Sequence, residues 1–229
     1  MRKYDAVIFD LFGTLIDNFS LAEHEQVLSA MATVVGADHT EFVHLWLQTF
    51  DQRATGAFAS TEANIAYVCQ LLKLSPKPEA VALAAQTRIT FTEKALVPRS
   101  DALAILTILK EKGHKLGLIT DCSSEVPAIW DASPFAALID VPVFSCAVGM
   151  RKPDPRIYRR ACTALAADPQ RCLYVGDGGS HELSGALRVG LDPVLIQQPK
   201  GTEHDAHRID SEEWSGPTIS SLSDVLGLV

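Results

Sequence analysis

The 229-residue chain lacks any apolar run long enough to cross a membrane. A membrane-spanning helix needs about 18 or more consecutive apolar residues. The apolar stretch that follows the basic start Met1-Arg2-Lys3 is cut at Asp10, which makes it too short for the hydrophobic region of a secretory signal. The sequence therefore predicts a soluble protein with no membrane partner.

Cysteine is sparse and irregularly placed. The five cysteines are scattered along the chain, and none of them forms a Cys-x-x-Cys pair. This spacing argues against a zinc knuckle and gives no disulfide framework. Such usage is typical of a reducing compartment, so we expect a cytoplasmic protein.

Positive charge is also in short supply. The chain has 20 Lys and Arg against 28 Asp and Glu, a net charge of −8. No basic face is available to collect phosphates along a polymer, so we predict no nucleic-acid partner. The hydrophobic fraction of 47% supports a sizeable core, and the length fits one large domain or a core with a smaller companion. The sequence does not indicate the oligomeric state.

Residues 17–94 lack strand patterns and show apolar residues at helical spacing. We predict helices that begin after Ser20, run through residues 42–50, begin at Ser60 and cover residues 79–94. Between them, residues 51–56 are expected to break the helical pattern. Arg53 in this stretch has two interpretations, a substrate contact or a solvated surface residue beside Asp51.

Short apolar runs elsewhere predict the strands of a buried parallel sheet. They occupy residues 6–9, 115–120, 141–146, 172–176 and 191–196. Crossover helices are expected between them, and Ser123 and Ser124 are expected to cap one of these helices. The polar run 201–213 is predicted to be a loop, and residues 219–229 a closing turn or helix.

Reactive side chains follow several of these strands directly. Asp10 ends the first strand, and Gly13 permits a sharp turn behind it. A carboxylate cannot remain unpaired in an apolar core, so Asp10 should lie at the carboxyl edge of the sheet, where ligands bind in open α/β folds. Lys152 stands before two closely spaced prolines, which restrict the backbone and aim its ammonium group.

Four segments resemble, in order, the motifs of the haloacid dehalogenase-like hydrolases. They are Phe9-Asp10-Leu11-Phe12-Gly13-Thr14-Leu15, Ile119-Thr120-Asp121, Arg151-Lys152-Pro153-Asp154-Pro155 and Gly176-Asp177 with Glu182 beyond it. The resemblance implies an α/β fold with a Rossmann-like three-layer core and a parallel sheet. It also implies a small all-helical cap, with residues 1–16 and 95–229 as the core and 17–94 as the cap.

The same resemblance implies a role for each matching residue. Asp10 would be the nucleophile, Thr120 a hydrogen-bond donor to the transferred group, and Lys152 the partner of Asp10. Magnesium would be held by Asp10, the Phe12 carbonyl and Asp177, with Glu182 as a partner. The substrate, a small and anionic molecule, would be bound by Gly13, Thr14, Arg53 and Asp121.

Phe12 departs from the phosphatase pattern, which has a second aspartate two residues after the nucleophile. Loss of a general acid–base group typically costs about 10²–10⁴-fold in rate. Because the acids that would hold magnesium are present, we still predict a magnesium-dependent phosphatase of a small phosphorylated metabolite. Two alternatives remain. One is a metal-independent 2-haloacid dehalogenase, which Phe12 fits and Asp177 with Glu182 does not. The other is a catalytically weak ligand-binding homologue.

Overall fold

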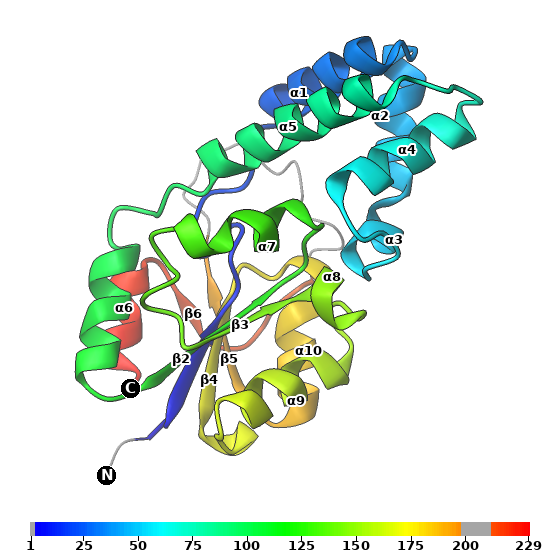
Figure 1. Cartoon of the computed structure of the whole chain (residues 1–229). Helices are drawn as coiled ribbons and strands as arrows, with labels where there is room; N and C mark the ends of the chain where they lie inside the picture. Colours follow the sequence, from blue (N-terminus) through cyan, green and yellow to red (C-terminus); the bar gives the residue numbers. More distant parts are fainter. Residues whose placement is uncertain (1–2, 198–211) are drawn as a thin grey trace.

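A computed structural model describes residues 3–197 and 212–229 of the chain. A parallel sheet of six strands, in the order β3-β2-β1-β4-β5-β6, forms its centre (Figure 1). The strands are β1 (Ala6–Phe9), β2 (Lys115–Thr120), β3 (Val141–Phe144), β4 (Cys172–Gly176), β5 (Asp192–Ile196) and β6 (Thr218–Ile219). The predicted parallel sheet is confirmed, while β6 was not predicted because it contains only two residues.

Alternate residues of β1 enter different cores, which makes the fold three-layered. Ala6 and Ile8 pack in one apolar cluster, and Val7 and Phe9 pack in another, all four fully buried. Helices α9 and α10 cover the first face, while α6 and α7 lie on the second. This two-sided burial explains why the strand sequences are continuously apolar.

Helices of the sheet region follow their expected positions except at residues 145–148, which form a short helix although residues 145–146 were expected to continue a strand. They are α6 (Ala102–Glu111), α7 (Glu125–Ile129), α8 (Ser145–Val148), α9 (Pro155–Ala164) and α10 (Glu182–Val189). Short 3-10 helices cover Trp130–Ala132, Pro169–Arg171, Gly179–His181 and Leu222–Gly227. The last of these, together with β6, forms the closing segment.

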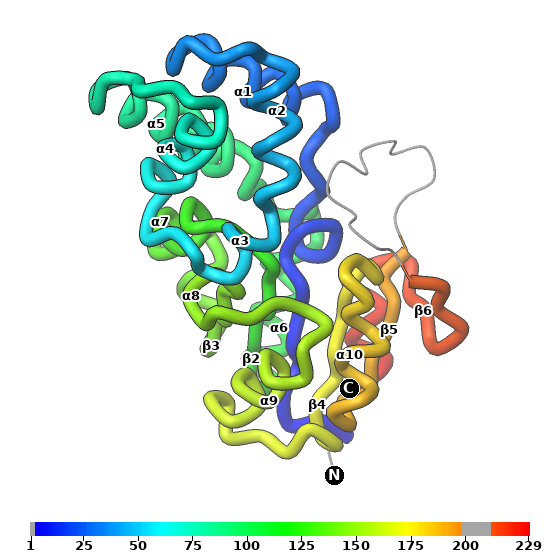
Figure 2. The backbone as a smooth tube through the Cα atoms, turned by 90° about the vertical axis from the view of Figure 1, so that its right-hand side faces the viewer, coloured from blue at the N-terminus to red at the C-terminus, as the bar shows by residue number. Residues whose placement is uncertain are grey.

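A separate group of helices stands over the carboxyl edge of the sheet (Figures 1 and 2). They are α1 (Leu21–Val35), α2 (His39–Gln48), α3 (Phe50–Ala54), α4 (Thr61–Leu71) and α5 (Pro78–Ala95). These helices share an apolar cluster of their own, centred on Met31, Phe42 and Trp46. The assignment of residues 17–94 to a cap domain stays a prediction, and this separate cluster is what favours it.

Two local predictions about this chain need correction. Residues 51–54 continue the helical pattern as part of the short helix α3 (Phe50–Ala54), and the expected break comes only at Thr55 and Gly56, which form a turn. Ser124 occupies the N-cap position of α7 but makes no capping hydrogen bond with its side chain. Its hydroxyl instead lies 3.2 Å from that of Thr61, across the boundary between the two helical groups.

Two of the predicted helix starts carry the expected capping hydrogen bonds. The Ser20 and Ser60 side chains accept hydrogen bonds from the backbone N–H groups of Glu23 and Ala63. Among the described residues, no helix has the length and apolar character to span a bilayer. The loop predicted for residues 201–213 lies outside the described residues except for its last two.

We expect Ile8→Ala to lower the free energy of unfolding by about 2–5 kcal/mol, because it empties a fully buried site at the centre of the sheet. Urea denaturation followed by circular dichroism measures this loss. Leu83→Ala is the control, since the side chain is 57% exposed and the expected change is within about 0.5 kcal/mol. Equal losses in the two variants would contradict the assigned core.

Candidate active site

Asp10 lies at the carboxyl end of β1, where its backbone N–H donates to the Val175 carbonyl of β4 at 2.9 Å. Only 4% of the residue is exposed. The Lys152 Nζ atom donates to Asp10 Oδ1 at 2.5 Å and to Glu182 Oε2 at 2.6 Å. Lys152 precedes α9, so the chain brings together three segments that are far apart in sequence.

Glu182 begins α10 and is fully buried. Besides Lys152, it accepts hydrogen bonds from the Tyr174 hydroxyl at 2.7 Å and the Gly178 N–H at 2.9 Å. A Cβ at Gly176 would lie 2.2 Å from Glu182 Oε1, so the glycine that ends β4 makes room for this carboxylate. Burial raises the pKa of Glu182 to about 8, and the charge of Lys152 opposes that shift.

Asp177 follows β4, and its carboxylate lies close to those of Asp10 and Glu182. Its Oδ1 atom accepts from the Gly179 N–H at 3.0 Å, and its Oδ2 atom accepts from the Asn18 side chain at 3.4 Å. Gly13 has φ +81°, and a Cβ there would lie 2.3 Å from Asp177 Oδ2. Gly13 therefore provides both the turn after Asp10 and the space for the second acid.

The turn between Asp177 and Glu182 has an unusual backbone. Ser180 and His181 have φ values of 55° and 49°, both in the left-handed region. Each such non-glycine residue costs on the order of 1–3 kcal/mol and persists only where the surroundings fix it. The turn carries Glu182 back toward Lys152, and His181 itself is exposed.

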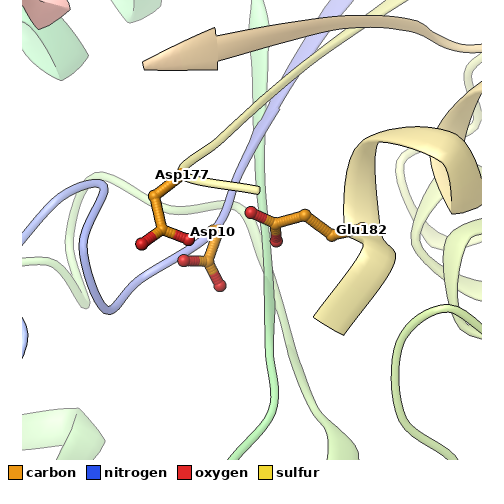
Figure 3. A group of neighbouring side chains, drawn as sticks. All are labelled: Asp10, Asp177 and Glu182. Carbon is orange, nitrogen blue, oxygen red and sulfur yellow. The ribbon is translucent and has the colours of Figure 1, made fainter. Parts of the chain in front are cut away.

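Carboxylate oxygens of Asp10, Asp177 and Glu182 lie within 4.8 Å of one another and are buried (Figure 3). Burial raises the pKa of Asp10 to about 6, with Asp177 adding to the shift and Lys152 opposing it. The charge of Asp177 contributes to this shift, so the two carboxylates repel each other and a divalent cation would relieve the repulsion.

The donor set fits magnesium, which takes oxygen ligands and keeps several waters. Asp10 and Asp177 are the residues that would hold it. Glu182 Oε2 already accepts from Lys152 and Tyr174, and its Oε1 accepts from Gly178. Glu182 thus lies close to the cation position while its main contacts are with Lys152 and Tyr174. The Phe12 carbonyl as a ligand stays a prediction.

A cavity of about 80 Å³ opens beside Asp10. Of the predicted substrate residues, Arg53 and Asp121 line it, together with Thr120, whose buried Oγ1 atom has no hydrogen-bond partner. Asp121 accepts a hydrogen bond from the Lys152 N–H at 3.0 Å, so its charge is engaged. Gly13 and Thr14 are not among the residues that line the cavity.

Sequence reasoning missed several cavity residues, among them Arg88, Glu125 and Phe19. Arg88 of α5 is 5% exposed, and its Nε donates at 2.9 Å to Glu125 of α7, which is 1% exposed. Phe19 contacts Phe12 with ring centroids 4.9 Å apart. Arg88 shares a helical stripe with the buried Ala84 and Thr92, and this spacing was an available signal. The contact with Glu125, 37 positions away, had no local signal.

Comparison with protein families identifies the class of protein to which this chain belongs. A family model described as a haloacid dehalogenase-like hydrolase matches residues 4–190. The chain belongs to this family and is a hydrolase, as predicted.

Relatives of two named activities resemble this chain. It is 27% identical over 199 residues to a glyceraldehyde 3-phosphate phosphatase of Methanopyrus kandleri, covering 85% of this chain and 84% of the relative. It is 24% identical over 197 residues to (S)-2-haloacid dehalogenase 4A of Burkholderia cepacia, covering 84% and 83%.

Solved structures agree on the fold. A phosphatase from Thermococcus onnurineus has a TM-score of 0.66 at 21% identity, covering all of this chain and 97% of the other. The L-2-haloacid dehalogenase of Xanthobacter autotrophicus has a TM-score of 0.63 at 20% identity, covering 98% of each chain. Both activities therefore occur on this architecture, and the choice between them depends on the site.

We expect Gly13→Ala to reduce turnover at least 100-fold, because its Cβ would displace the Asp177 carboxylate. Gly36→Ala is a matched control: Gly36 also has a left-handed φ, +73°, but nothing lies within 4 Å of the added Cβ. Both changes introduce strain on the order of 1–3 kcal/mol. Steady-state kinetics, with urea denaturation to compare folding, test this, and similar kinetics for the two variants would contradict the role of Gly13.

Proposed function

We propose that the protein is a magnesium-dependent phosphatase that acts on a small phosphorylated metabolite through an aspartate nucleophile. The observation that carries this proposal is the buried Asp177 carboxylate beside Asp10, over Gly13. Two buried carboxylates in that position repel each other unless a cation lies between them. Phosphatases among the relatives support the same assignment.

Asp10 is proposed to attack the phosphorus atom, and the bond between phosphorus and the substrate oxygen breaks. The aspartyl-phosphate is then opened by water, which regenerates the carboxylate and releases phosphate. In this reaction Lys152 would hold Asp10 in place and offset negative charge, and Thr120, which lines the cavity, would donate to a phosphoryl oxygen. When bound, magnesium supplies further neutralisation of the anionic substrate and the acids.

Phe12 cannot move a proton, so the leaving oxygen receives none from that position. We therefore expect the aspartyl-phosphate to form more readily than it is cleared. We also propose that α1 to α5 act as a cap over the site, because Phe50 and Arg53 of α3 and Arg88 of α5 line the cavity. The free cysteines favour a cytoplasmic location.

A 2-haloacid dehalogenase is the second candidate, and Phe12 is the observation that favours it. Its ring lines the cavity beside Asp10 and packs on Phe19. In that reaction an Asp10 oxygen would attack carbon, halide would leave, and water would open the ester. Asp177 argues against this candidate, since the reaction needs no second acid at that point.

Magnesium removal and Asp10→Asn are expected to have the same effect. Hydrolysis of a phosphate ester should require added magnesium and stop on chelation, because the charges at Asp10 and Asp177 are otherwise unscreened. Asp10→Asn should lose all but a trace of turnover, since an amide is a poor nucleophile. Phosphate release measures both, and circular dichroism checks the fold. Substantial turnover by the variant would remove Asp10 from its role.

Phe12→Asp should raise magnesium-dependent phosphate release by tenfold or more, a modest part of the ~10²–10⁴-fold that acid–base catalysis supplies. The new carboxyl group would lie close to the leaving oxygen. In a dehalogenase the same change would add charge beside the nucleophile and suppress halide release.

The experiment assays the wild type and this variant on a phosphate ester and on 2-chloropropionate, with and without magnesium. Phe12→Leu is the control, because it removes the ring without adding a carboxyl group. Metal-independent chloride release by the wild type, lost in Phe12→Asp, would replace the phosphatase with the dehalogenase.

A further inference from the structure

The cavity has two chemically different ends. One end contains Asp10, Lys152, Asp177 and Thr120, where the reaction is proposed to occur. The other is a wall that we call the arginine wall, made by Arg53, Arg88, Ser123, Glu125 and the rings of Phe19 and Phe50. Neither the proposed attack by Asp10 nor the opening of the aspartyl-phosphate by water involves this wall.

Arg53 is a buried cation whose hydrogen-bond partners are all neutral. It is 4% exposed, and its Nη1 donates to the Ser123 hydroxyl at 2.9 Å while Nη2 donates to the Trp46 carbonyl at 2.7 Å. Its Nε has no partner, and no carboxylate of the described residues lies within ion-pair distance of it. The guanidinium also lies 4.2 Å from the centroid of the Trp46 ring.

The positive charge of Arg88 is largely compensated by the carboxylate of Glu125. The pair is joined by the 2.9 Å contact from Nε to Oε1, while Arg88 Nη1 and Glu125 Oε2 both lack partners. The arginine wall therefore contains two guanidinium groups and one carboxylate. Burial lowers the pKa of Arg53 to about 9, and the charge of Arg88 lowers it further while Glu125 opposes the shift. An anion beside Arg53 would balance the excess positive charge of the arginine wall.

A buried charge without a counter-charge is costly, and proteins seldom keep one without a use. The spare donors on Arg53 and Arg88 suit the planar oxygens of a carboxylate. Glu125 Oε2 repels an anion on its own side, which leaves Arg53 as the residue best placed to receive one.

The size of the cavity limits the ligand. One water needs about 10–15 Å³ of such space. The cavity of about 80 Å³ includes both the end at Asp10 and the arginine wall. This volume favours a compact ligand, such as one whose carboxylate lies one or two carbons from the reacting group.

We propose that the substrate is a phosphorylated short-chain hydroxy acid whose carboxylate is bound by Arg53, with Arg88 and Glu125 positioning the wall. The proposal rests on the phosphatase function for its reaction and on the arginine wall for its substrate class. It assigns a specificity-determining role to Arg53 and a positioning role to the Arg88–Glu125 pair.

The first test compares phosphoglycolate with its carboxamide, phosphoglycolamide, which has the same shape and no carboxylate charge. The wild type should prefer phosphoglycolate at least tenfold in kcat/KM. Arg53→Gln should bring the ratio close to one, and Arg53→Lys should restore part of it because it retains the charge. Arg171→Gln is the matched control, since Arg171 pairs with Asp5 before β4, away from the cavity, and its ratio should equal that of the wild type.

The second test does not depend on turnover. Glycolate should raise the melting temperature of the wild type and of Arg171→Gln, glycolamide should not, and Arg53→Gln should show no shift with either. Equal use of phosphoglycolate and its amide by the wild type overturns the carboxylate site and leaves the phosphatase standing. Stabilisation by glycolate that needs Arg53, without turnover of any phosphate ester, supports the carboxylate site and overturns the phosphatase.

Discussion

The contact of Lys152 with Asp10 and Glu182 is the interaction on which the rest of the site depends. All three residues are at most 4% exposed, and a carboxylate moved from water into such a place is strongly disfavoured without a partner. Removing one member of a buried ion pair typically costs about 3–5 kcal/mol, because the other charge is left uncompensated. Lys152 therefore compensates the two buried carboxylates of Asp10 and Glu182.

The backbone around this contact is shaped to let the acids come together. Gly13 and Gly176 each lie where a Cβ would overlap a carboxylate, that of Asp177 in one case and that of Glu182 in the other. Ser180 and His181 adopt left-handed conformations in the turn that joins the two acids. Backbone strain of this kind concentrates at functional sites, where neighbouring contacts fix it. Here those contacts are the hydrogen bonds that Glu182 accepts.

Sequence reasoning succeeded where the signal was local. The runs at β1, β2 and β4 predicted buried parallel strands, and the ordered motifs predicted that Asp10, Thr120, Lys152 and Asp177 would meet at one edge of the sheet. It failed where a contact joins distant segments. Arg88 with Glu125 is such a contact, and so is Arg53 with Ser123, 70 positions apart. β6 escaped notice because two residues carry no periodic pattern.

Phe12 provides aromatic packing at a position where an aspartate would provide proton transfer. The ring contacts Phe19, and Phe19 contacts Phe91 of α5, with centroids 4.9 Å apart in each case. This row of rings connects the turn after the nucleophile to the helix that carries Arg88, whose guanidinium lies 5.5 Å from the Phe19 centroid. An aspartate at position 12 would provide a proton-transfer group and lose that packing. If the proposed function holds, the residue that cannot transfer a proton beside Asp10 also packs on the ring next to Arg88, so catalytic speed and substrate selection would be opposed at this position.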